Sequence, residues 1–135
     1  MAQATPSAPS NYMLLFQNAG PETHRHLNSE QRTKLMQQWN DWYEGLLARG
    51  KVEQGRPLAL TGRMVAMTGG RVVDGPYAET KEAVGGYFLL TVADLDEAVA
   101  IAKQCPGLPL GVVVEVRPLA EESPVLSGVR GRPAG

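Results

Sequence analysis

The sequence contains very little cysteine. Among its 135 residues there is one, Cys105, so the chain cannot form an internal disulfide. No cluster of cysteine and histidine has the spacing of a structural zinc site, and we expect neither a metal nor another cofactor. A single thiol in a chain of this size fits a reducing, cytoplasmic setting.

Charge of one sign and long apolar runs are also missing. Thirteen Lys and Arg against fourteen Asp and Glu leave a net charge of −1, so no overall field draws the protein to phosphate backbones or anionic lipid. No apolar run approaches the roughly 18 residues that span a membrane. The first residues have neither the basic nor the apolar region of a signal peptide. We therefore expect no direct nucleic-acid partner and no membrane partner.

Glycine and proline, in contrast, are abundant, with 15 and 10 copies. Hydrophobic residues at 43% and charged residues at 20% are typical of a globular chain that can bury a core. Small residues and prolines gather at the two ends, which predicts tails over 1–11 and 120–135. The remaining residues, 12–119, have the length of one domain.

Apolar spacing and capping residues predict two helices. Over residues 28–49 the apolar residues recur on one helical face, and Asn28 and Gln31 have the spacing of a capping box. A second helix begins at Asp94 and should stop at Pro106.

Runs of apolar or alternating residues predict the strands 12–17, 58–67, 71–74, 85–92 and 111–117, the third of which follows a Gly-Gly hairpin turn. When 58–67 and 71–74 are counted together as one hairpin unit, the order is β-α-β-β-α-β, that of a ferredoxin-like α+β fold with two helices on one face of an antiparallel sheet. The other face would be too apolar for water, because it would carry Met64, Ala66, Tyr87, Leu89 and Val113. We therefore expect a homodimer, with a pocket between sheet and helices or at the interface.

The most distinctive string is Asp-Gly-Pro-Tyr-Ala-Glu-Thr-Lys-Glu at 74–82, followed by Gly85-Gly86-Tyr87. Asp-Gly-Pro forces a turn, and the two glycines let a backbone pass close to a neighbour. An ordinary turn with solvated charges explains the string. The alternative is a site with a proton acceptor at Asp74, Glu79 or Glu82 and with Tyr77, Lys81 and Tyr87 as binding residues.

Three further groups of residues are candidates. His24 and His26 follow the first strand, where an imidazole can act as a general base, ligate a metal or simply belong to a loop. Glu115 and Arg117 share one strand face and can pair with each other or orient a substrate. Cys105 sits at a helix C-terminus, which disfavours a reactive thiolate, so we expect it to be packed and inert.

The stretch DGPYAETKEAVGGYFLLTVADLDEAVAIAKQCPG, followed by VEVRPL, closely resembles the DGPF-type branch of the YCII-related family. The name-giving Asp-Gly-Pro-Phe is here Asp74-Gly75-Pro76-Tyr77, and the stretches YMLLF and WNDWYEGLLARG are similar to the same family. The resemblance covers about residues 12 to 119. It implies a dimeric α+β barrel of ferredoxin-like subunits, in agreement with the order of elements above.

For function the resemblance offers two different expectations. YCII-like proteins are suspected enzymes where they carry a His near the first long helix and an Asp in an Asp-Pro pair. Here that pair resembles Cys105-Pro106 and the helix from Asn28 contains no His, so the dyad does not carry over. One expectation is thus a small-molecule binder, or a cofactor-independent isomerase-like enzyme with an acidic proton-transfer residue. The other is a non-catalytic dimeric module that binds a sigma factor, because DGPF-type members are similar to domains found with sigma factors of the extracytoplasmic type.

Overall fold

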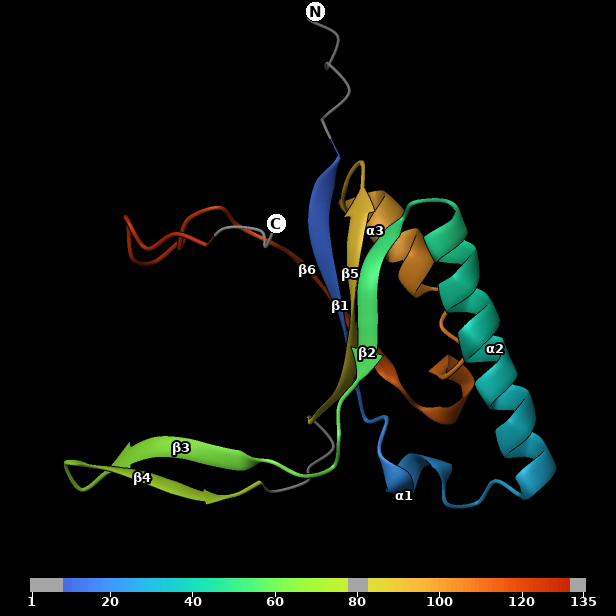
Figure 1. Cartoon of the computed structure of the whole chain (residues 1–135), viewed down its shortest axis with the longest axis horizontal. Coiled ribbons are helices and arrows are strands. Elements are labelled where there is room, and N and C mark those ends of the chain that lie inside the picture. The colour runs from blue at the N-terminus through green and yellow to red at the C-terminus, as the bar shows by residue number, and fades with distance from the viewer. Residues whose placement is uncertain (1–8, 78–82, 132–135) are drawn as a thin grey trace, which may run out of the picture.

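The protein is an antiparallel sheet with helices on one face, in a computed structural model that describes residues 9–77 and 83–131 (Figure 1). In chain order the elements are β1 (Ser10–Gln17), α1 (Pro21–His24), α2 (Ser29–Ala48), β2 (Val52–Pro57), β3 (Arg63–Thr68), β4 (Arg71–Pro76), β5 (Val84–Val92), α3 (Leu95–Ala102), a 3₁₀ turn (Leu108–Leu110) and β6 (Val113–Pro118). The main sheet has the order β2-β5-β1-β6. This confirms the predicted α+β class with an antiparallel, ferredoxin-like sheet.

Strand alternation decides which side chains form the core. In β1, Leu14 and Phe16 are buried beneath the helices, while the alternate residues Met13 and Leu15 point to the opposite, open face. Leu14 lies opposite Phe88 of β5 and Val116 of β6, so the three neighbouring strands β5, β1 and β6 present one apolar face together. The core also takes in the buried side of α3, at Ala98, Ile101 and Ala102.

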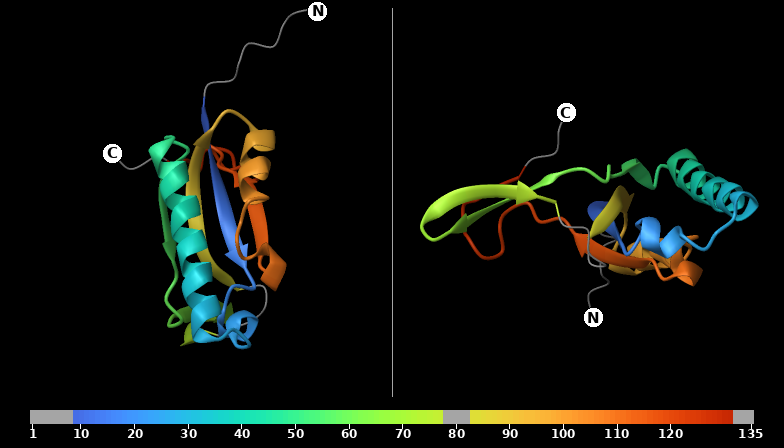
Figure 2. Two further views of the ribbon diagram at one scale, coloured as in Figure 1. Left: turned by 90° about the vertical axis from the view of Figure 1, so that its right-hand side faces the viewer. Right: turned by 90° about the horizontal axis from the view of Figure 1, so that it is seen from below.

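Helix α2 begins where the capping box predicted. The Asn28 side chain accepts a hydrogen bond from the Gln31 backbone N–H at 2.8 Å, and the Gln31 side chain accepts one from the Asn28 backbone N–H at 2.9 Å. Farther along, Trp39, Trp42 and Tyr43 face the sheet and pack against its buried cluster. The helix therefore runs alongside the strands on one face of the sheet, attached by its aromatic residues (Figure 2).

The second sheet strand is not where the sequence predicted it. Residues 52–57 form β2 and pair with β5, whereas the apolar run at 58–67 leaves the sheet and contributes β3 to a separate hairpin. β2 escaped prediction because only Val52 is buried, and the strand otherwise carries polar residues, a glycine and a proline. The placement of Met64 and Ala66 on the open face of the sheet is wrong, since both lie exposed on the hairpin.

Two short elements and several boundaries also differ from the sequence prediction. The turn predicted at Asp-Gly-Pro is wrong, because β4 continues through Asp74 and Gly75 to Pro76 and pairs with β3 there. The one-turn helix α1 and the 3₁₀ turn at Leu108–Leu110 were not anticipated. Helix α3 ends at Ala102, and the residues up to Cys105 continue as turns closed by the N–H groups of Gln104 and Cys105. The predicted hairpin turn is present, with positive φ at Gly69 and Gly70.

One face of the main sheet has no helix on it. Tyr87, Leu89 and Val113 point to this open face, as expected from alternation. The β3–β4 hairpin and a C-terminal loop over 121–131 extend from the sheet on this same side (Figures 1 and 2). The loop is closed by the Ser123 N–H to the Val129 carbonyl and by a bridge between Glu122 and Arg130. Among the described residues, none of the helices combines the length and apolar character needed to cross a bilayer.

Candidate functional site

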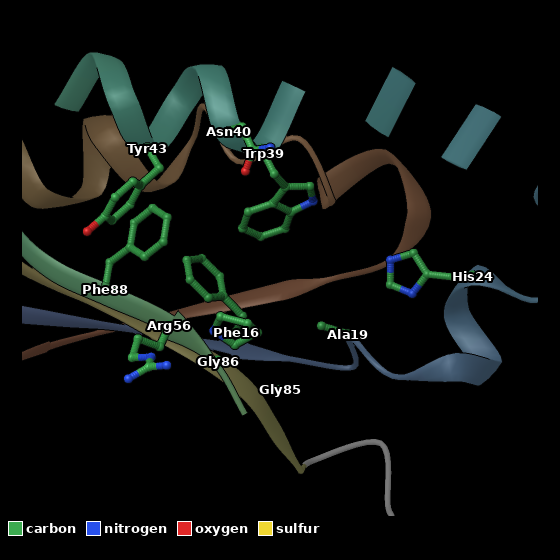
Figure 3. Close-up of a pocket in the computed structure, with 12 residues that line it drawn as sticks. Phe16, Ala19, His24, Trp39, Asn40, Tyr43, Arg56, Gly85, Gly86 and Phe88 are labelled. Atoms are coloured by element: carbon green, nitrogen blue, oxygen red, sulfur yellow. The ribbon is translucent and has the colours of Figure 1, made fainter. Parts of the chain in front are cut away.

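A cavity of about 360 Å³ lies between the helical layer and one end of the sheet (Figure 3). Its walls come from β1, α1, α2, β2 and β5. Four of its lining residues are aromatic, namely Phe16, Trp39, Tyr43 and Phe88; three are glycines, Gly55, Gly85 and Gly86; and two, His24 and Asn40, contribute polar side chains. The cavity is within the size range of small-molecule sites, roughly 300–1,000 Å³.

The aromatic wall is held by contacts among its own rings. Phe16 lies edge-to-face with Trp39 and with Phe88, at a centroid distance of 5.0 Å in each case. Tyr43 packs against Phe88 at 5.2 Å. Edge-to-face pairs at these distances fix ring orientation, so the wall is built before any ligand enters.

The two glycines of β5 let neighbouring chain segments approach its backbone closely. A β-carbon on Gly86 would lie 3.0 Å from the Arg56 carbonyl oxygen, and one on Gly85 would lie 3.1 Å from the Ala19 β-carbon. The two glycines were predicted to allow such an approach. They leave one side of the cavity without side chains.

His24 stands at the opposite end of the cavity from the packed rings (Figure 3). Its Nδ1 lies 2.8 Å from the carbonyl oxygen of Gly20, one turn earlier in α1. Two contacts fix this short helix: the Thr23 hydroxyl donates to the Asn18 carbonyl at 2.7 Å, and Arg32 of α2 donates to the His24 carbonyl at 2.7 Å. The imidazole is half-buried, and the Nε2 side of its ring is directed toward the cavity.

Formal charge is scarce around the cavity. Among the described residues that line it there is no Asp, Glu or Lys. Arg56 contributes backbone, because it pairs with Tyr87 and its guanidinium lies on the other side of the strand from the aromatic rings (Figure 3). The site is thus an aromatic slot with one imidazole at its end.

The structure places the predicted acidic residues elsewhere or does not describe them. Asp74 lies exposed on the hairpin, with an oxygen 3.5 Å from an Arg63 nitrogen. Glu79, Lys81 and Glu82 fall in the stretch 78–82, outside the described residues. No cluster of Asp74 with these residues can therefore be described.

The predicted binding residues are spread over three places. Tyr77 lines a second, smaller cavity of about 170 Å³ beside the hairpin. Tyr87 is on the open face, where its hydroxyl donates to Gln54 at 3.4 Å. Glu115 and Arg117 pair on that face at 3.0 Å, and Glu115 also accepts from Gln17 at 2.7 Å.

Among the candidates from the sequence that fall in the described residues, His24 lines the larger cavity. Trp39 and Tyr43, on the apolar face of α2, pack on the core and also face the cavity. Phe88 and Gly55 were missed, because their roles depend on pairing between β2 and β5. In the sequence, the pair Gly85-Gly86 was the signal that this end of β5 is closely approached and borders the cavity.

Cys105 is not among the described residues that line the cavity. Cys105 is buried, and loss of hydration raises the pKa of its thiol, while hydrogen bonds from the Gly107 and Leu108 backbone lower that pKa by less. Among the described residues, no group of three His, Cys, Asp or Glu side chains is placed to hold a metal ion.

The family model for the YCII-related domain matches residues 11–121, which is most of the chain. The chain belongs to the YCII-related family. It is also 46% identical over 54 residues to the uncharacterized protein R00369 of Rhizobium meliloti (strain 1021). That match covers 39% of this chain and 44% of the relative, so less than half of the relative's length is spanned by this YCII-related chain.

Proposed function

We propose that this YCII-related protein binds a small molecule in the cavity between α2 and the sheet. The observation that carries the proposal is the preformed aromatic wall facing an inward-directed imidazole. Protein cores are close-packed, so a space of about 360 Å³ beside Phe16, Trp39 and Phe88 is more than core packing alone would leave. Mostly apolar pockets with a few convergent polar groups are the usual form of a ligand site.

We further propose that the protein acts as a homodimer of the dimeric α+β barrel type. Met13, Leu15 and Leu89 form an apolar strip on the open face that no helix covers. The hairpin on the same side exposes Val65, Met67 and Val72, each with 69% of its surface accessible. A two-stranded hairpin is marginal alone in water, so a partner surface would stabilise it. A second copy of the chain has the same uncovered apolar face, so pairing the two faces across a two-fold axis would bury both.

Catalysis, in this proposal, would be cofactor-independent and isomerase-like, with His24 as the proton-transfer group. An imidazole can take and return a proton near neutral pH. The acidic residues first considered, Asp74, Glu79 and Glu82, stay predictions. Asp74 lies on the hairpin and is not among the described residues that line this cavity.

We propose a second function from the resemblance to the DGPF-type branch of the YCII-related family. The C-terminal loop exposes Val125, Leu126 and Val129, with 86%, 65% and 57% of their surfaces accessible. Such a loop supports docking on a protein partner, for which a sigma factor is the candidate. A complex with a sigma factor that is lost when residues 120–135 are removed would favour this function.

The ligand-binding proposal is tested by filling the cavity from α2. Asn40 is exposed on this helix and lines the cavity, so Asn40→Trp would occupy it without replacing a core residue. Gln38→Trp, on the same helix and not among the lining residues, is the matched control. A library of small aromatic and carboxylate compounds is screened for a rise in Tm of the wild-type protein. We expect hits for wild type and Gln38→Trp that vanish in Asn40→Trp; hits that persist in all three would place binding elsewhere.

A further inference from the structure

We propose that the cavity selects a neutral, planar aromatic molecule whose hydroxyl group, of the phenol or enol class, donates a hydrogen bond to Nε2 of His24. This inference rests on the proposed function and names the ligand class for that site. Three features of the described residues carry it: the tautomer of His24, the shape of the aromatic slot, and the lack of countercharge.

The tautomer follows from the partner of Nδ1. A backbone carbonyl oxygen can only accept, so the 2.8 Å contact between Nδ1 and the Gly20 oxygen requires the proton to be on Nδ1. In a neutral imidazole the other nitrogen, Nε2, is then an acceptor. Both partners belong to one helical turn, so this state is set before a ligand arrives. The group that fits Nε2 is therefore a donor.

The shape of the slot favours a flat ring. Trp39 and Phe16 stand at 89° to each other, and Figure 3 shows their rings between the sheet and α2 with His24 across the open space. The glycine backbone at Gly85 and Gly86 closes another side without side chains. A ring that enters here meets aromatic faces and edges, which is where a planar aromatic ligand gains most contact area.

Charge decides between a neutral and an ionised ligand. The described lining residues include no carboxylate and no lysine, and the Arg56 guanidinium lies across the strand from the rings. A charged group brought into this slot would lose hydration without gaining an opposite charge. A neutral hydroxyl needs no opposite charge, and it can donate a hydrogen bond to Nε2. Among the described residues, the hydrogen bond of the His24 ring is made by Nδ1, which leaves Nε2 available.

The experiment compares three naphthalene probes by titration calorimetry, at a pH of about 8, where a free imidazole is neutral. The probes are 2-naphthol, which donates; 2-methoxynaphthalene, which has the same ring and cannot donate; and 2-naphthoate, which is charged. We expect 2-naphthol to bind at least about tenfold more tightly than either of the others, because losing a donor leaves a half-buried acceptor unpaired. Equal or tighter binding of the ether or the carboxylate would overturn the proposal.

The variants isolate the imidazole from the slot. His24→Phe should keep the aromatic cavity and abolish the preference for 2-naphthol over the ether. His26→Phe, at an exposed position outside the lining, should leave the preference unchanged. A preference that survives His24→Phe would assign the hydroxyl to another group.

A measurement without ligand or variant tests the first step independently. Nitrogen-15 NMR of the wild-type imidazoles should report His24 as the Nδ1–H tautomer at the same pH. An Nε2–H tautomer overturns the inference even if ligands bind. Failure of all three probes, with library hits still blocked by Asn40→Trp, also overturns it and leaves the ligand-binding function standing.

Discussion

The backbone of Gly55 lies against the ring of Phe88. A β-carbon on Gly55 would stand 2.9 Å from Phe88 Cε1 and 3.0 Å from Tyr43 Cε1, closer than side chains tolerate. The contact joins edge strand β2 to the aromatic cluster under α2. It also sets one wall of the cavity, because Gly55, Tyr43 and Phe88 all line it.

Gly55→Ala should therefore destabilise the protein, because the added methyl must displace Phe88 or move β2. We expect the free energy of unfolding to fall by about 1–3 kcal/mol, the usual cost of overpacking. Gly45→Ala is the matched control, since its β-carbon on α2 would have no neighbour within 4 Å. That variant should gain about 0.4–1 kcal/mol. Urea denaturation measures both, and an unaltered Gly55→Ala would show that β2 yields freely.

Asn28→Ala tests the start of α2. The substitution removes the acceptor for the Gln31 N–H, and it should cost about 1 kcal/mol, in the range known for helix caps. Ser29→Ala, one residue later and also exposed, should change stability by less than about 0.5 kcal/mol. Equal effects of the two variants in denaturant titrations would contradict a role for the capping box.

The parts of the fold that were predictable are those whose signal lies within a short stretch of chain. The start of helix α2 was predictable from Asn28 and Gln31, and the hairpin turn was predictable from Gly69 and Gly70. Strand β2 did not, because what makes it a strand is its pairing with β5 and the ring of Phe88 above Gly55. The apolar run at 58–67 was wrongly predicted as a strand of the main sheet, because its apolar side chains are exposed and not buried in this chain.

The candidate site divides in the same way. His24 could be suspected from its position after the first strand, yet its importance depends on the Gly20 carbonyl and on rings from three other elements. Phe16 and Phe88 meet only because β1 and β5 pair side by side. The charges of the segment after Asp-Gly-Pro suggested a site at Asp74. In the fold, Asp74 lies on the β3–β4 hairpin beside Arg63 and not at the cavity.

The ion pair between Glu97 and Lys51 predicts a pH dependence of stability. The Ala93 N–H donates to the Glu97 carboxylate at 2.8 Å, and Lys51 Nζ lies 2.8 Å from it; the backbone hydrogen bond and then the lysine lower the pKa of Glu97 below its ordinary value of 4.5. A carboxylate with a lowered folded pKa adds stability above its unfolded pKa, and this contribution is lost as the pH falls through the folded value.

Glu97→Gln should thus be less stable than wild type at a pH of about 7, by about 0.2–1 kcal/mol because the pair is partly exposed. The difference should shrink as the pH falls below about 4. Glu44→Gln, an exposed carboxylate on α2, controls for loss of a surface charge. Thermal unfolding across this range is the measurement; a gap between Glu97→Gln and wild type that does not change with pH would contradict the assignment.

Cys105 should be unreactive in the folded protein. Only 3% of its surface is accessible, and its thiol pKa is raised, so both access and thiolate formation are suppressed. Thiol–disulfide exchange with an aromatic disulfide reagent, which forms a mixed disulfide and releases an aromatic thiolate, should be at least about tenfold slower in buffer than in denaturant. Ala100→Cys, which puts a second thiol at an exposed position of α3, should add one fast phase. A fast phase in the wild-type protein would show that the helix end opens.

Leu89→Lys tests the proposed dimer. Leu89 lies on the open face opposite Met13 of β1, in the middle of the apolar strip that we assign to a second copy. A charge there would have to be buried without a partner, so the variant should be a monomer at concentrations where wild type is a dimer. Leu95→Lys, at an exposed leucine on α3, should stay dimeric. Light scattering coupled to size exclusion separates these outcomes. A wild-type protein that is monomeric at about 100 μM, well above the dissociation constants of stable dimers, would contradict the dimer and leave the hairpin to another partner.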